Sequence, residues 1–186
     1  RYVVRLQGSS YAGAFNREVA SDNYNDKNDA TGQYDWQAQG FTGLDVYGND
    51  NDNTIVGSAL GDNLYGLGGN DTIKGKDGND YIEGGDESCA AGLFGKCGAG
   101  DTIEGGKGDD TIKGGNEECG AAVFATCDAG DNIDGGQGKD TIIGGNEKCG
   151  VAVFAGCNAG DTINGGNDDD TISGGNEECG AVALAG

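Results

Sequence analysis

The sequence DTIEGGKGDDTIKGGNEECGAAVFATCDAG (residues 101–130) decides the architecture of this chain. It returns with few changes as DNIDGGQGKDTIIGGNEKCGVAVFAGCNAG (131–160) and again from residue 161 as DTINGGNDDDTISGGNEECGAVALAG. Within each unit lies a shorter pattern of nine residues, Gly-Gly-x-Gly-x-Asp-x-Ile-x, which is complete at 105–113. Repetition at a short fixed period is typical of solenoids, in which each repeat stacks on the next. The repeat therefore predicts an all-β fold, a parallel β-roll or β-solenoid.

Each nine-residue unit offers one aliphatic side chain between two outward ones, and a glycine-rich turn follows. Two units make one coil with two short parallel strands, and successive coils stack at the strand spacing of about 4.8 Å. The aliphatic side chains then form two facing ladders. One ladder comprises Ile55, Ile73, Ile103, Ile133 and Ile163, and the other comprises Leu64, Ile82, Ile112, Ile142 and Ile172.

The turn that returns the chain to the first ladder is short once, at 66–71, and is longer in every later coil. Each longer turn carries a pair of cysteines around an apolar centre, such as CGAAVFATC at 119–127. We expect these inserts to protrude from a two-sheet roll. The alternative is that Val-Phe-Ala forms a third strand and makes the coil triangular.

The domain organisation follows from where the repeats begin. Residues 53–186 are predicted to form the roll, with coils of 18 residues to about residue 82 and coils of 30 residues after it. Residues 1–52 share neither period and hold most of the aromatic residues. This segment is expected to cap the first coil, which solenoids require for solubility. In the alternative, RYVVRLQ (1–7) is an assembly segment that pairs with the sheet edge of another subunit.

Composition and charge exclude several classes of function. The chain of 186 residues has a net charge of −21, 40 glycines and no histidine. Such a charge argues against nucleic acid and anionic membranes as partners and calls for cations to neutralise it. No apolar run is long enough for a transmembrane helix, so no membrane insertion is expected. Because the sequence begins without Met and the seventh cysteine has no partner, we expect a mature product or fragment whose natural chain continues past residue 186.

The nine-residue unit resembles the calcium-binding β-roll repeat of the repeats-in-toxin (RTX) family. The resemblance covers roughly 53–175, and GGKGDDTIK (105–113) matches at every fixed position. It implies that several Ca²⁺ ions bind between neighbouring coils, held by turn carbonyls and aspartate carboxylates. Carried over by position, the aspartates are Asp62, Asp80, Asp110, Asp140 and Asp170 on one edge of the roll, and Asp71, Asp101, Asp131 and Asp161 on the other.

Elementary electrostatics supports calcium independently of the resemblance. Aspartates stacked one coil apart repel each other by about 3 kcal/mol at an effective dielectric of about 20. A hard divalent cation converts that repulsion into ligation, and oxygen-only ligands suit Ca²⁺. GSALGD (57–62) lacks the second glycine of the motif, so the first site is expected to be weak or empty. The long return turns keep only the last part of the motif, which weakens the case for calcium on that edge.

Further acidic residues stand at the entrance of each insert. We expect them to form a solvated, solubilising rim, with extra calcium ligands as the alternative. These residues are Asp86, Glu87, Glu117, Glu118, Glu147, Glu177 and Glu178.

Seven cysteines at two fixed phases indicate a disulfide framework and therefore an oxidising compartment outside the cytoplasm. Pairing within each insert is favoured, because closing a short loop stabilises the fold. The favoured pairs are Cys89–Cys97, Cys119–Cys127 and Cys149–Cys157. A ladder that links successive coils is the rival, since the strand spacing also suits a disulfide.

The apolar tips of the inserts recur in every long coil and are candidates for self-association. They either stack on one another as a second small core or present a stripe to another subunit. The aromatic residues of these tips are Phe94, Phe124 and Phe154.

The sequence offers little for catalysis, because histidine is absent and no nucleophile–base constellation is recognisable. We therefore expect a non-enzymatic, calcium-binding structural module that is secreted or lies at the cell surface. It would be a subunit of a self-assembling filament, sheath or surface layer. Alternatives are a calcium-responsive RTX segment of a larger secreted toxin, hydrolase or adhesin and, less favoured, an ice-binding face of threonine ranks.

Overall fold

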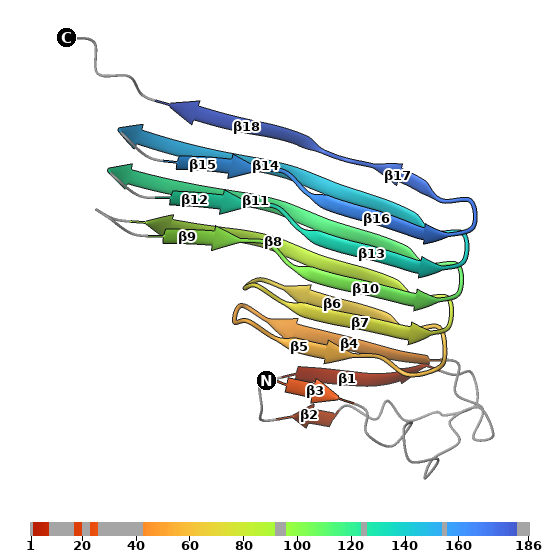
Figure 1. Ribbon diagram of the computed structural model, residues 1–186. Helices are drawn as coiled ribbons and strands as arrows, with labels where there is room; N and C mark the ends of the chain where they lie inside the picture. Colours follow the sequence, from red (N-terminus) through yellow and green to blue (C-terminus); the bar gives the residue numbers. More distant parts are fainter. Residues whose placement is uncertain are drawn as a thin grey trace.

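The chain winds into a β-solenoid whose coils stack along one axis (Figure 1). The structure, a computed structural model, describes residues 2–7, 17–19, 23–25, 43–91, 96–123, 126–153 and 156–181. All regular structure in these ranges is β-strand, which confirms the predicted all-β solenoid. None of the described residues belongs to a helix with the length and apolar character that crossing a membrane requires.

One wall of the solenoid is a six-stranded sheet in which every neighbouring pair is parallel. Its strands, in spatial order, are β16 (Thr162–Asn167), β13 (Asn132–Gln137), β10 (Thr102–Lys107), β7 (Thr72–Asp77), β5 (Thr54–Val56) and β3 (Asn23–Asn25).

The opposite wall is a nine-stranded sheet. Its strands, in spatial order, are β17 (Thr171–Ser173), β14 (Thr141–Val153), β11 (Thr111–Val123), β8 (Tyr81–Ala91), β6 (Asn63–Leu67), β4 (Gly43–Asn49), β1 (Tyr2–Gln7) and β2 (Arg17–Val19), while β18 (Asn176–Ala181) also pairs with β14. The pairs are parallel from β4 onward, whereas β1 runs antiparallel to both β4 and β2.

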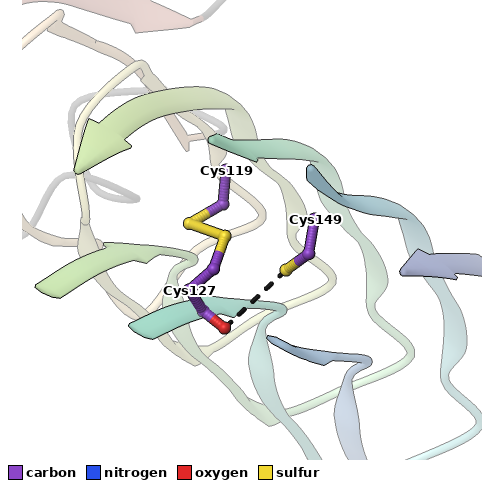
Figure 2. A group of neighbouring side chains, drawn as sticks. All are labelled: Cys119, Cys127 and Cys149. Carbon is purple, nitrogen blue, oxygen red and sulfur yellow. Dashed lines mark hydrogen bonds between the residues drawn. A yellow bond between two sulfur atoms is a disulfide. The ribbon is translucent and has the colours of Figure 1, made fainter. Parts of the chain in front are cut away.

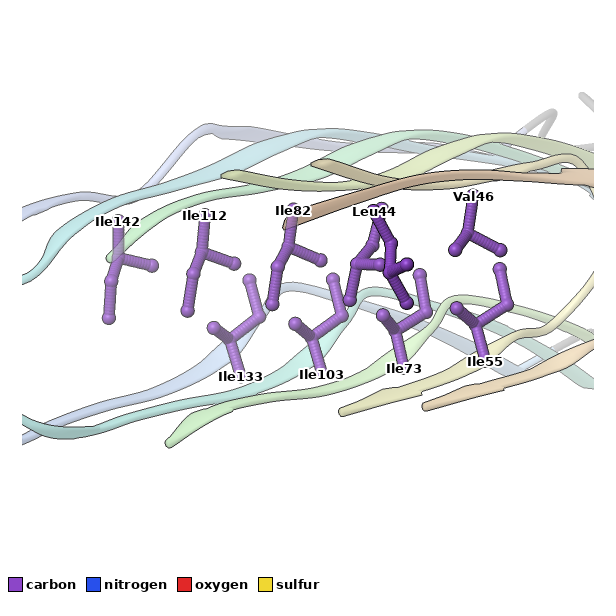
Figure 3. Packing of buried hydrophobic residues seen from close by; sticks show 10 residues of the cluster. Leu44, Val46, Ile55, Ile73, Ile82, Ile103, Ile112, Ile133 and Ile142 are labelled. Carbon is purple, nitrogen blue, oxygen red and sulfur yellow. The ribbon is translucent and has the colours of Figure 1, made fainter. Parts of the chain in front are cut away.

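The core is a double ladder of aliphatic side chains between the two walls (Figure 3). Ile82, Ile112 and Ile142 stand in register on one wall, and Ile103 and Ile133 face them from the other. These side chains are at most 1% exposed. Burial of each stabilises the fold by about 1.5–3 kcal/mol. Both predicted ladders are confirmed, although Ile163 is only partly buried and Ile172 is 48% exposed.

Regular coil geometry begins before the boundary expected at residue 53. β4 pairs in parallel with β6, which places Val46 beside Leu64, and β3 pairs in parallel with β5. Leu44 and Val46 are buried in the ladder. β1 lies antiparallel along β4 at the N-terminal side of this first coil (Figure 1). That position suits a cap, which stays a prediction.

The inserts are two-layered extensions of the roll. β8, β11 and β14 continue past their Gly-Gly pairs as single strands of 11 to 13 residues. The chain returns through a separate parallel sheet of three short strands, β9 (Lys96–Ala99), β12 (Thr126–Ala129) and β15 (Gly156–Ala159). A third strand thus exists in the three long coils whose return is described, but it contains the second cysteine of the insert, whereas the triangular alternative put it at Val-Phe-Ala.

Close approach of consecutive coils explains the glycine-rich turns. Gly106 and Gly108 adopt φ angles of 123° and 126°, in the region that side chains rarely allow. A Cβ on Gly106 would lie 1.8 Å from the carbonyl oxygen of Lys76 in the preceding coil. Any other residue at this position would push the two coils apart.

Candidate metal centre

Two ranks of aspartates line the two edges at which the coil turns. One oxygen of each carboxylate accepts the backbone N–H of the equivalent residue in the preceding coil. Asp101 Oδ1 accepts from Asp71 N at 2.7 Å, and Asp110 Oδ1 accepts from Asp80 N at 2.8 Å. The carboxylates are therefore held against the backbone and point into the solenoid, where Asp71, Asp101 and Asp110 are at most 2% exposed.

The second oxygen of most of these carboxylates is buried without a hydrogen-bond partner. These atoms are Oδ2 of Asp71, Asp80, Asp101, Asp110, Asp131, Asp140 and Asp161. A buried carboxylate oxygen left in this state is strongly unfavourable unless a cation or a proton neutralises it. Because the same atom is orphaned in coil after coil, the arrangement indicates a repeated ligand that the protein atoms do not supply.

Each orphaned oxygen except that of Asp161 lies beside a glycine of its own turn and a backbone carbonyl of the next coil. A Cβ on Gly75 would lie 2.2 Å from Asp80 Oδ2 and 2.4 Å from the carbonyl oxygen of Gly105. On the other edge, a Cβ on Gly84 would lie 2.1 Å from Asp101 Oδ2. Carboxylate and carbonyl oxygens thus converge on space that only glycine leaves open. Donor sets made of oxygen suit Ca²⁺, which takes roughly six to eight such ligands at about 2.3–2.6 Å.

Comparison with protein families gives the same assignment. The RTX calcium-binding nonapeptide repeat matches in four copies, over residues 57–88, 98–117, 128–147 and 158–177. The chain belongs to the RTX calcium-binding repeat family. Comparison with curated proteins and with solved structures gave no match. RTX repeats bind Ca²⁺, and the aspartate ranks with their neighbouring carbonyl oxygens fit that ion.

The RTX match also separates the calcium-binding part of each long coil from its cysteine-containing insert. The gaps between its four copies are residues 89–97, 118–127 and 148–157, which carry six of the seven cysteines, and Cys179 follows the last copy. The inserts are therefore additions to an RTX roll, placed on one of its two edges (Figure 1).

Burial makes the aspartate ranks poor acids in the absence of a cation. Desolvation, reinforced by neighbouring carboxylates, raises the pKa of Asp80 to about 8 and that of Asp131 to about 7. Desolvation likewise raises the pKa of Asp110 to about 6. A bound Ca²⁺ would favour the charged forms and reverse this trend.

Asp62, at the start of its rank, differs from the other aspartates. Its Oδ2 accepts the backbone N–H of Ser58 at 2.5 Å, and its Oδ1 accepts the Ser58 hydroxyl at 3.0 Å. Leu60 fills the turn and is 9% exposed. Ser58 thus satisfies the carboxylate without a metal, in keeping with the weak or empty site expected from GSALGD. At the other end of the rank, Asp170 faces Gly165 and is half-buried.

The glutamates at the insert entrances correct the sequence prediction. Glu87, Glu117 and Glu147 are 4%, 1% and 1% exposed, so these three do not form a solvated rim. The remaining acidic residues of the group are exposed as predicted, namely Asp86, Glu118, Glu177 and Glu178. The sequence signal for these buried glutamates is the recurrence of Gly-Gly-x-Glu at one phase of every long coil, a pattern that an exposed acidic rim would also produce.

The disulfides use both pairing modes. Cys119 is bonded to Cys127 within one insert, the pairing favoured from the sequence (Figure 2). Cys157 is bonded to Cys179 of the following coil, so the expected Cys149–Cys157 pair is not formed. The Cα–Cα distances of the two bonds, 5.9 and 6.2 Å, both lie in the usual disulfide range. Because the two registers stack, partners within and between coils are almost equally near.

Cys149 is a buried free thiol, and its Sγ lies 3.8 Å from the carbonyl oxygen of Cys127 (Figure 2). Cys89 is disulfide-bonded, whereas the side chain of Cys97 lies outside the described residues. Phe94, Phe124 and Phe154, the self-association candidates, also lie outside them. A second core does form in the inserts, but its described part consists of cysteines and alanines.

Proposed function

We propose that this RTX chain is a secreted, non-catalytic structural module that calcium folds and disulfides brace. We propose further that it assembles with copies of itself into an extracellular filament, sheath or surface layer. The observation that supports the first part most strongly is the pair of aspartate ranks, whose buried Oδ2 atoms have no hydrogen-bond partner.

Calcium binding and folding are coupled in this proposal. The unfolded chain is highly charged and has no preformed sites, so the free energy of ion binding becomes free energy of folding. The apolar core is a thin double ladder, one side chain wide on each wall. We infer that in calcium-free solution carboxylate repulsion outweighs this core, and that the roll forms when the ion is supplied.

An extracellular setting is supported by the cysteines. The bonds Cys119–Cys127 and Cys157–Cys179 require an oxidising compartment. RTX repeats are also typical of proteins that meet calcium outside the cell.

Self-assembly is supported by a sheet edge. β16 and β17 stand at the ends of their sheets, and among the described strands neither has a neighbour on its outer side. Ile172 of β17 is 48% exposed although its ladder partner Ile142 is fully buried. An uncovered edge of this kind accepts a further parallel strand, either from a second copy or from a further coil of a longer chain.

The assembly proposal is tested with the 186-residue chain at millimolar calcium, with and without chelator. We expect electron microscopy and light scattering to show elongated particles that chelation disperses. Ile172→Lys should block the contact, whereas Ile143→Lys, the same change on the outer face, should not. Dispersed monomers under both conditions would sink the assembly proposal and favour a segment of a larger secreted protein, while leaving calcium-dependent folding intact.

A further inference from the structure

We propose that the glutamates at the insert entrances form two additional calcium sites, one between β8 and β11 and one between β11 and β14, which the nine-residue motif does not contain. Two clusters carry the proposal. The first consists of Glu87, Glu117 and Asp131, and the second of Glu117, Glu147 and Asp161. In each cluster one carboxylate oxygen from every residue lies within 4.8 Å of the others. The inference rests on the calcium-binding role of the roll and extends it to the edge that lacks the full motif.

The glutamates are buried without partners. Both carboxylate oxygens of Glu87, Glu117 and Glu147 lack an N–H or O–H donor among the described residues. Their nearest partners are other carboxyl groups, Glu117 beside Glu87 and Asp161 beside Glu147, and such a pair can share a hydrogen bond only when one member is protonated. Among the described residues, the nearby Lys148 points elsewhere, because its Nζ lies 3.8 Å from the exposed Glu118. Six orphaned oxygens in one buried row are a stronger demand for a cation than acidic composition alone.

The backbone places this row where the turn motif is interrupted. β8, β11 and β14 pair in parallel, with Glu117 in register between Glu87 and Glu147. In the short return turn, the third residue after the first glycine is Gly69, with φ 100°. In the long coils that position is glutamate, three residues after Gly84, Gly114 and Gly144. In the long coils, glutamate therefore occupies the position that glycine holds in the short return turn. Its carboxylate stands where the short turn would offer backbone carbonyl oxygens as ligands.

The donor set of each cluster fits calcium. Asp131 belongs to the cluster with Glu87 and Glu117. Its Oδ2 also lies beside the carbonyl oxygen of Gly144, since a Cβ on Gly114 would lie within 2.6 Å of both atoms. Carboxylates and a backbone carbonyl are hard oxygen ligands, and the chain holds no histidine that would favour a transition metal. Sharing Glu117 between two clusters links the ions of neighbouring coils.

Protons are the competing occupant of this row. Desolvation and the neighbouring aspartates raise the pKa of Glu87 to about 9, and the same causes raise that of Glu117 to about 10. In calcium-free solution both shifts favour the protonated, neutral side chains. Glutamine substitutions distinguish protons from calcium as the occupant of this row. Glutamine mimics the protonated acid, but it is a poor replacement for a charged calcium ligand.

The test is equilibrium dialysis of the full chain against calcium buffers at about pH 7.5. This experiment counts the bound ions. Glu117→Gln should remove the ions of both clusters or weaken them at least tenfold, because it belongs to both. Glu147→Gln should affect one cluster only. Glu118→Gln is the matched control, since it removes the same charge from an exposed neighbour and should bind calcium as the parent chain does.

Circular dichroism at saturating calcium checks that each variant is folded. If Glu117→Gln does not fold, Glu147→Gln alone decides, because it leaves the other cluster intact. Parent-like binding by folded glutamine variants would overturn the inference and assign the row to protons. Asp110→Asn, on the opposite edge, tests the aspartate sites of the roll separately from the glutamate sites. If Asp110→Asn also bound calcium as the parent chain does, the proposed aspartate sites of the roll would be wrong as well. If Asp110→Asn lost calcium while the glutamine variants did not, only the glutamate sites would be wrong.

Discussion

The backbone N–H of Asp101 donates a hydrogen bond of 2.6 Å to Oδ1 of Asp131, the equivalent residue one coil later. The other oxygen of Asp131 is buried and has no such partner. One carboxylate thus fixes the spacing of two coils with Oδ1 and presents Oδ2 to a cation. A metal ion at Oδ2 would act directly on coil stacking, so we expect calcium binding and folding to be coupled in this chain.

Replacing Asp110 by Asn tests a single member of the aspartate rank. The amide oxygen can still accept the Asp80 N–H, but the charged ligand is lost. We expect the calcium-loaded roll to lose about 2 kcal/mol of stability, a typical value for a hydrogen-bonded charged group. Calcium-dependent thermal unfolding measures the change. Asp109→Asn removes the same charge from the exposed adjacent position, and equal losses in both variants would show that only net charge matters.

Gly135→Ala tests the space in which the oxygens converge. The new Cβ would lie 2.5 Å from Asp140 Oδ2 and 2.4 Å from the carbonyl oxygen of Gly165. Overpacking of this kind costs about 1–3 kcal/mol, and here it also occludes the cation. Gly150→Ala is the control, since its Cβ would meet nothing within 4 Å. Chemical denaturation in calcium should separate the two variants, and parent-like stability of Gly135→Ala would contradict the packing described.

The pH dependence of the calcium-free chain follows from its buried acids. Burial raises the pKa of Asp110 to about 6, that of Asp71 to about 7 and that of Asp80 to about 8. A raised pKa in the folded state adds stability at pH values below the unfolded pKa, and this stability is lost as pH rises through the folded value. In metal-free buffer, β-structure should therefore decrease between pH 6 and 8. Far-UV circular dichroism that shows an increase over this range would contradict the burial of these carboxylates.

Calcium should reverse the sign of that dependence. Ion binding requires ionised carboxylates, so protons compete with it. The calcium affinity of the folded roll should rise as pH rises from 6 to 8, the interval over which Asp110 and Asp80 ionise in the folded state. A calcium affinity of the folded roll that is independent of pH would mean that other groups hold the ion.

The disulfide pattern is checked by peptide mapping under non-reducing conditions. We expect one peptide pair joined through Cys119 and Cys127 and another through Cys157 and Cys179. Cys149 should resist thiol reagents in calcium and react after unfolding, because it is buried. A Cys149–Cys157 bond would restore the pairing within inserts that the sequence favours.

The ladders and turns of the roll were predictable because each residue's environment is local. One aliphatic residue per nine places Ile112 above Ile82 and below Ile142, whatever the rest of the chain does. The glycine and aspartate phases then follow from the coil edges. The same reasoning missed β4, because its turn at residues 48–53 lacks the Gly-Gly-x-Gly-x-Asp pattern although Val46 occupies the ladder.

Sequence spacing alone does not determine whether the glutamates are buried or which cysteines pair. Whether Glu117 faces inward depends on β11 running on past Gly114 and Gly115, and periodicity does not show whether a strand turns or continues there. The bond within a coil and the bond between coils span nearly equal Cα–Cα distances, 5.9 and 6.2 Å, so spacing alone does not distinguish the two pairing modes. Both outcomes are properties of stacked coils and are absent from any single repeat.

The most direct test of the account is a calcium titration of the chelated chain, followed by far-UV circular dichroism. The buried aspartate ranks predict that β-structure appears cooperatively as calcium is added, disappears again with chelator, and does not form with magnesium at the same concentration, because Mg²⁺ demands a tighter octahedral site. A β-sheet spectrum that persists unchanged after exhaustive chelation at neutral pH would contradict the claim that calcium holds this roll together.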